Sequence, residues 1–211
     1  MKHLLEKYTL LLAIIVQFVL VGLAQADTIA LSFSGGGTWT WTEATIGWEF
    51  TVSQPINVTS LGVWQSGDSL ADEHQVGIWL SAGGSPLVST TVTSANPLIN
   101  GFRYRAISPF TLQPGTYVIG CYMPTFADLG AADASYSTNF PVTYTKNLFL
   151  YDSGFTIPTT EWVDFDGGNF GPNFQFVSAP AAIPTLSEWG MIFMSLMLAG
   201  SAFWVIRRRT S

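Results

Sequence analysis

The chain has 211 residues and a formal net charge of −6, with 10% charged and 48% hydrophobic side chains. Its mean hydropathy of +0.33 is high for a soluble domain, and the excess lies in one apolar segment at each end. Between these segments, residues 27–182 carry three Lys/Arg against twelve Asp/Glu, a net charge of −9 that repels phosphates. This composition excludes a disordered, collagenous or disulfide-stapled chain and argues against nucleic-acid binding.

Residues 1–26 have the parts of a secretory signal peptide. Lys2 and Lys7 give a positive start, and residues 10–23 form an apolar run that is short for a membrane span. Residues 24–26, Ala-Gln-Ala, form a small-residue cleavage site, so we expect signal peptidase to release a chain that begins at Asp27. An uncleaved N-terminal anchor is the alternative.

Residues 27–177 are predicted to form one all-β ectodomain. Short runs rich in β-branched and aromatic residues are separated by turn residues, and none has a sustained helical period. The predicted strands are 28–34, 45–52, 56–65, 74–81, 87–93, 101–107, 115–123, 147–151 and 173–178. Many short strands without helices favour a jelly-roll-like antiparallel β-sandwich. Residues 124–146 lack the pattern, so long loops are expected there.

Trp39 and Trp41 are the candidate ligand-binding aromatics. They lie two residues apart, after three glycines and among threonines, and residues two apart on a strand share a face. An exposed tryptophan pair would form a flat apolar platform that suits the face of a sugar ring. Burial of both rings in the core is the alternative.

Residues 67–70, Gly-Asp-Ser-Leu, resemble the nucleophile motif of a large esterase and lipase family. The resemblance implies Ser69 as a nucleophile, which needs a base, and His74 is the only histidine after the signal peptide. That family has a helix-rich α/β frame and a C-terminal Asp-x-x-His, and this sequence has neither. The alternative for His74 is an imidazole at a strand end, bonded to a loop carboxylate.

Two acidic clusters are candidates for calcium. Asp68, Asp72 and Glu73 share one loop, and Asp164 and Asp166 precede two glycines. Calcium takes several carboxylate and carbonyl oxygens from a flexible loop, although neither cluster matches an EF-hand. A solvated acidic turn is the competing interpretation and the favoured one.

Residues 47–124 contain a characteristic series of segments. They include the strand Val-Thr-Ser-Leu-Gly-Val at 58–63, a Gly-Asp loop, the strand His-Gln-Val-Gly-Ile-Trp at 74–79, and Thr-Tyr-Val-Ile-Gly at 116–120. Residues 170–174 also fit. This series is similar to a β-sandwich domain of unknown function common in secreted bacterial proteins with C-terminal sorting signals. The resemblance implies a fold but no activity.

The C-terminal segment has three parts after a short linker at 178–182. A motif at 183–190 is followed by an apolar stretch at 190–206, which predicts a transmembrane helix, and by a basic tail at 207–211. The motif residues are Ile183, Pro184, Thr185, Leu186, Ser187, Glu188, Trp189 and Gly190, and the basic residues are Arg207, Arg208 and Arg209. Three arginines place their end of the helix in the cytoplasm and the ectodomain outside it.

These three parts resemble the IPTL-type C-terminal sorting signal of bacteria. The resemblance implies a Gram-negative-type cell and an exosortase-type membrane protease that cuts near the motif. We therefore expect a non-enzymatic exported protein, anchored in the inner membrane until processing, and then a surface or extracellular-matrix component. Extracellular polysaccharide is the candidate ligand, and calcium the only candidate cofactor. The alternatives are a secreted ester hydrolase using Ser69 and a purely structural envelope protein without a ligand.

Overall fold

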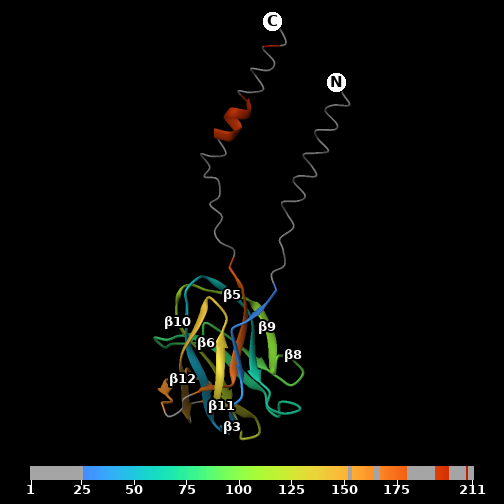
Figure 1. Cartoon of the computed structure of the whole chain (residues 1–211), viewed down its shortest axis with the longest axis vertical. Coiled ribbons are helices and arrows are strands. Elements are labelled where there is room, and N and C mark those ends of the chain that lie inside the picture. The colour runs from blue at the N-terminus through green and yellow to red at the C-terminus, as the bar shows by residue number, and fades with distance from the viewer. Residues whose placement is uncertain (1–25, 152–153, 164–166, 180–192, 200–207, 209–211) are drawn as a thin grey trace. The chain divides into compact units, whose positions relative to one another are not determined.

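A computed structural model describes residues 26–151, 154–163, 167–179, 193–199 and 208 (Figure 1). The chain divides into two compact units, residues 1–178 and 179–211. The first unit is all-β in its described part, and every strand pairing in it is antiparallel. This agrees with the predicted all-β sandwich.

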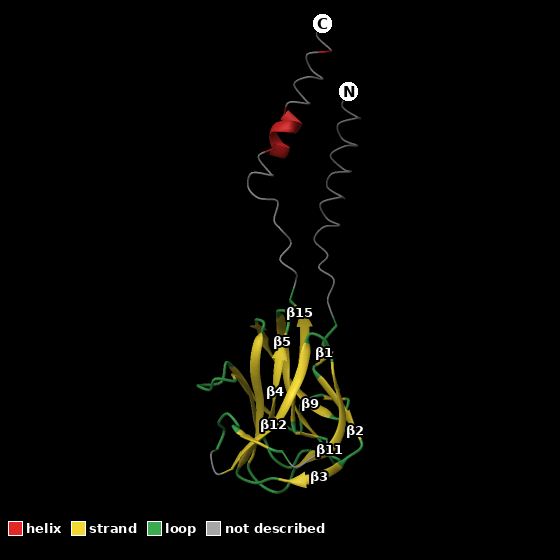
Figure 2. Cartoon of the chain, turned by 60° about the vertical axis from the view of Figure 1, so that its left-hand side comes forward, coloured by secondary structure: helices red, strands yellow, loops and turns green. Residues whose placement is uncertain are grey.

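The strands form two larger sheets and one smaller sheet (Figure 2). The five-stranded sheet has the order β1 (Thr28–Ile29), β15 (Pro172–Ser178), β5 (Ile56–Trp64), β9 (Phe102–Leu112) and β8 (Leu98–Ile99). The six-stranded sheet has the order β13 (Thr160–Glu161), β12 (Val142–Tyr151), β4 (Ala44–Val52), β10 (Gly115–Met123), β6 (His74–Leu80) and β7 (Val88–Val92). The smaller sheet contains β14 (Gly168–Phe170), β11 (Leu129–Thr138) and β2 (Leu31–Ser34), and β3 (Gly37–Thr40) also pairs with β11.

Trp48 joins the two larger sheets at the centre of the core. It lies on β4, is 0% exposed, and its ring stacks on Phe174 of β15 with centroids 6.0 Å apart. Its indole Nε1–H donates a hydrogen bond to the carbonyl of Pro172 at 2.9 Å. A buried tryptophan needs such a partner for its one polar group, so this bond fixes β15 above β4.

Three glycines lie side by side across the six-stranded sheet. Gly120 of β10 is paired with Gly47 of β4 on one side and with Gly77 of β6 on the other. An added Cβ at Gly77 would lie 2.9 Å from the ring of Phe155 and 3.0 Å from that of Trp79. Gly77 therefore leaves room for these two rings, which contact each other with centroids 5.1 Å apart.

The chain changes sheets between β1 and β2. Thr28 and Ile29 pair with β15, whereas Leu31 to Ser34 pair with β11. At the crossing, the side chain of buried Asn173 takes the place of a neighbouring strand. Its Oδ1 accepts from the Leu31 N–H at 3.3 Å, and its Nδ2 donates to the Leu31 carbonyl at 2.7 Å. Both backbone groups of Leu31 are thus satisfied where the sheets separate.

Two sequence predictions need correction. Residues 124–146 were expected to form long loops, but they contain β11 and the first half of β12. β11 is rich in alanine and serine, which are weak strand formers, and its extended form depends on pairing with β14, β2 and β3. The predicted strand 28–34 is divided at Ala30, because its two halves belong to different sheets.

The second unit is described at residue 179, at residues 193–199, which are helical, and at residue 208. Within the described part of the chain, no helix has the length and apolar content needed to cross a bilayer. The predicted transmembrane helix at 190–206 is therefore not confirmed. Residues 1–25 of the predicted signal peptide 1–26, the motif at 183–190, and Arg207 and Arg209 lie outside the described residues.

Cys121 provides a test of the core. Its side chain is fully buried on β10, and this burial raises the pKa of the thiol. Because the thiolate is the reactive form, we expect iodoacetamide to leave the native full chain unmodified and to alkylate its single cysteine in concentrated guanidinium chloride, as measured by intact mass. Equal labelling rates in both states would contradict a core position for Cys121.

Candidate functional site

The Gly-Asp-Ser-Leu motif lies in the loop between β5 and β6. Residues 66–69 are exposed, and the Ser69 hydroxyl donates to the carbonyl of the adjacent Leu70 at 3.3 Å. A serine nucleophile needs its hydroxyl bonded to a base. This loop does not provide that arrangement, because His74, the candidate base, is bound to Tyr122 and Asp128.

His74 is 0% exposed at the start of β6, and both of its ring nitrogens have partners. Nδ1 lies 3.0 Å from the carbonyl oxygen of Tyr122, and Nε2 lies 3.0 Å from Oδ2 of Asp128. A carbonyl oxygen only accepts, so Nδ1 donates to Tyr122 and Nε2 faces the carboxylate of Asp128. Neither nitrogen is open to Ser69.

Asp128 connects three segments of the chain. It is 5% exposed just before β11, and besides His74 it binds the backbone of the 66–73 loop. The Ala71 N–H donates to both carboxylate oxygens at 3.0 Å, and the Asp72 N–H donates to Oδ2 at 2.8 Å. A carboxylate with several N–H donors can be buried, so this cluster is a structural tie.

The sequence predicted a carboxylate partner for His74 but not which one. The partner is Asp128, 54 residues along the chain, rather than a neighbour in its own loop. In the sequence, the partner is marked only as a carboxylate between Ala127 and Leu129. Its contact with His74 depends on how β10 and β11 lie in the fold.

The first acidic cluster is not assembled as a calcium site. The Thr125 hydroxyl donates to the carboxylate of Asp72, whose backbone N–H is bound to Asp128. Within the part of the chain that the structure describes, no three His, Cys, Asp or Glu side chains come together as a metal site. The prediction for Asp68, Asp72 and Glu73 is corrected accordingly, whereas Asp164 and Asp166 lie outside the described residues.

Trp39 and Trp41 have different environments, so the predicted exposed pair is corrected. Trp39, on the exposed strand β3, is 45% exposed, whereas Trp41 is 3% exposed and part of the core. Trp162 contacts both rings, with centroid distances of 6.0 Å to Trp39 and 5.1 Å to Trp41. Trp41 also stacks on Tyr151 at 5.7 Å. β3 ends at Thr40, and Trp41 then turns inward beneath this cluster.

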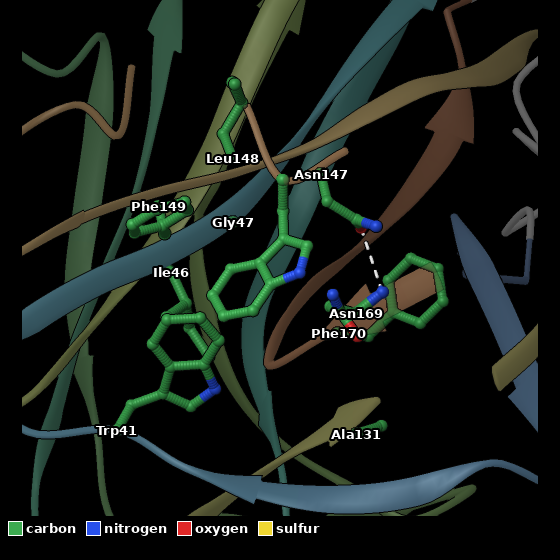
Figure 3. Close-up of a pocket in the computed structure, with 10 residues that line it drawn as sticks. Trp41, Ile46, Gly47, Ala131, Asn147, Leu148, Phe149, Asn169 and Phe170 are labelled. Carbon is green, nitrogen blue, oxygen red and sulfur yellow. Dashed lines mark hydrogen bonds between the residues drawn. The ribbon is translucent and has the colours of Figure 1, made fainter. Parts of the chain in front are cut away.

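A small pocket lies beside Trp41 (Figure 3). Its lining residues include Ile46, Phe149 and Phe170, together with Asn147, whose Oδ1 accepts from the Asn169 N–H at 2.9 Å. The free volume is about 10 Å³, the lower limit for one water molecule. The pocket is therefore the packed base of the tryptophan cluster and too small for a sugar or a cofactor.

Comparison with known families gives two matches. A domain of unknown function, DUF4082, matches residues 36–166, which is more than half of the chain. The IPTL-CTERM motif matches residues 181–209. No match was found among curated proteins or solved structures.

Asp128→Ala tests the structural tie. The change leaves the buried imidazole and two loop N–H groups without their acceptor, so we expect a loss of about 3–5 kcal/mol in the free energy of unfolding, measured in urea. Asp68→Asn in the exposed part of the same loop is the matched control, with an expected change of about 0.5 kcal/mol or less. Equal small losses in both variants would show that the Asp128 cluster contributes little.

Proposed function

The chain belongs to the DUF4082 family, and we propose that it is a non-enzymatic exported protein that binds polysaccharide outside the cell. The IPTL-CTERM motif is a sorting signal, which marks the chain as a surface or exported protein. Binding of polysaccharide is the further step. It is carried by one observation, the half-exposed ring of Trp39 on the surface strand β3.

We propose the following route to the surface. Signal peptidase removes residues 1–26, and the apolar stretch 190–206 holds the chain in the inner membrane with Arg207 to Arg209 on the cytoplasmic side. An exosortase-type protease then cuts near residues 183–190. The supporting features are the residue pattern of each segment and the match of residues 181–209 to the sorting motif.

Trp39 suits a sugar because its ring is both exposed and held in place. The Trp162 ring contacts it edge-on at an interplanar angle of 70°, so little side-chain freedom remains to be lost on binding. A ligand ring can then pack on the exposed part of the indole. The net charge of −9 over residues 27–182 disfavours acidic polymers, so the proposed ligand is a neutral polysaccharide.

A non-enzymatic function is supported by the surroundings of Ser69. Its hydroxyl bonds to Leu70, and both nitrogens of His74 are bound to Tyr122 and Asp128. For the alternative, a secreted ester hydrolase, Ser69→Ala should abolish cleavage of a nitrophenyl ester. We expect wild type and this variant to have the same background rate.

Trp39→Ala tests the proposed function. We expect the full chain in detergent to be retained on immobilised neutral polysaccharides, and the variant to lose most of this retention while its melting temperature stays within about 2 °C of wild type. Trp41→Ala is the control for core packing and should cost about 3–5 kcal/mol of stability.

Two outcomes would contradict the proposal. Wild type that is retained on no polysaccharide would favour a purely structural envelope protein. A large fall in melting temperature for Trp39→Ala would show that this ring contributes to the core instead of a binding surface.

A further inference from the structure

A cleft opens where β2 leaves the five-stranded sheet. It has a volume of about 250 Å³ and lies between β1–β2 on one side and the end of β5 with the start of β9 on the other. The cleft is separate from Trp39 and from the Asp128 cluster. Its lining residues are Ile29, Leu31, Ser32, Phe33, Trp64, Asn100 and Phe102.

The cleft exists because the sheets separate there. Asn173 binds both backbone groups of Leu31, so these groups face the five-stranded sheet, while Ser32 and Ser34 pair with Ser137 and Ser135 of β11. Backbone direction alternates along a strand, so the N–H and carbonyl of Phe33 face the same side as those of Leu31. No described strand pairs with β2 on that side. One backbone donor and one acceptor are thus directed toward the cleft.

Aromatic rings form the walls. The Phe33 ring meets Trp64 at 5.4 Å and 69°, and Phe102 at 5.6 Å and 83°. Phe33 also stacks on the buried Phe170 at 5.4 Å, which holds it from behind. Rings at steep angles to one another create an angular apolar space, which a flat or chair-shaped ring can fill.

Three of the lining residues carry polar side-chain groups without internal partners. The Ser32 hydroxyl, the Asn100 amide and the Trp64 indole N–H make no hydrogen bond to any residue that the structure describes. Asn100 is exposed in a left-handed conformation with φ 49°, which presents it at the turn before β9. These groups can donate to and accept from ligand hydroxyls.

The cleft also lacks charge. None of its lining residues is ionisable, and the nearby Arg103 is bound to the Gln65 side chain and the Asn96 carbonyl. The volume is below the roughly 300–1,000 Å³ of sites for drug-sized ligands, so one ring of a ligand fits. Apolar walls, unpaired hydroxyl-binding groups and neutrality together match a neutral hexopyranose.

We infer that this cleft binds a single neutral sugar ring, as the terminal unit of the polysaccharide. The inference rests on the proposed function for the class of ligand and names a second, separate contact for it. An open depression over β2 and β11 shares Ser32 and Phe33 with the cleft and contains exposed Tyr136. A chain whose end occupies the cleft can continue along that depression.

Titration of the full chain with free glucose, galactose and N-acetylglucosamine tests the inference through tryptophan fluorescence. We expect at least one sugar to give a saturable change in wild type and in Trp39→Ala. Ser32→Ala with Asn100→Gly should weaken that binding about tenfold, because two hydrogen-bonding groups are lost while the aromatic walls remain. Glycine keeps the left-handed backbone at residue 100, and Ser89→Ala on the surface of β7 is the matched control.

Trp64→Phe identifies the reporting ring. It should lose the fluorescence change while calorimetry still detects heat of binding, because the apolar wall is kept. No saturable response to any of the three sugars in wild type would overturn the cleft inference, and polysaccharide retention would then leave the proposed function standing. A response that is lost in Trp39→Ala and unchanged in Ser32→Ala/Asn100→Gly would also overturn it.

The two proposals can fail separately. A wild-type chain that responds to a free sugar through Ser32 and Asn100, but is retained on no polysaccharide, would support the cleft as a site for free sugars and reject polysaccharide binding. Retention lost in Ser32→Ala/Asn100→Gly as well as in Trp39→Ala would support one polymer that contacts both places.

Discussion

The side chain of Asn173 makes the architecture possible by replacing a strand where the chain leaves one sheet for another. Its amide binds both backbone groups of Leu31, so β1 can stay with β15 while β2 joins β11. Without this substitute, two polar groups would be buried unpaired at the crossing. The separation of the sheets opens the cleft, and the pairing with β11 places Phe33 against Trp64 and Phe102. One buried amide thus determines both the course of the chain and the shape of the cleft beside it.

The histidine cluster has the opposite character. His74, Asp128 and the backbone of residues 71–72 satisfy one another, and the two side chains are shielded from solvent. The Gly-Asp-Ser-Leu motif, which resembles a nucleophile motif in sequence, lies on the surface of a loop whose backbone is bound by Asp128. A binding or catalytic site needs polar groups that face an open space and still have unused hydrogen-bonding capacity. Here the cleft has such groups and the histidine cluster does not.

Several strands and the sorting segment could be predicted from sequence because their signals are local. The runs at 45–52, 56–65 and 115–123 alternate or are rich in β-branched residues, and strands lie there within one residue at each end. β11 could not be predicted, since alanine and serine become a strand only between three partners. Trp41 was misplaced for a related reason: strand alternation predicts a shared face with Trp39 but not that β3 ends at Thr40. The cleft combines residues from distant segments, which no spacing along the chain reveals.

The position of β15 has a consequence for biosynthesis. This last strand lies between β1 and β5 in the five-stranded sheet, and Pro172 and Asn173 at its start hold Trp48 and Leu31. The sheet cannot close until residue 178 is available, and the sorting match begins at residue 181. Contacts between the first and last strands span nearly the whole domain, and such long-range pairing forms slowly. The last strand and the sorting segment are therefore synthesised almost together, so a chain truncated before β15 would have neither a complete sheet nor a sorting signal.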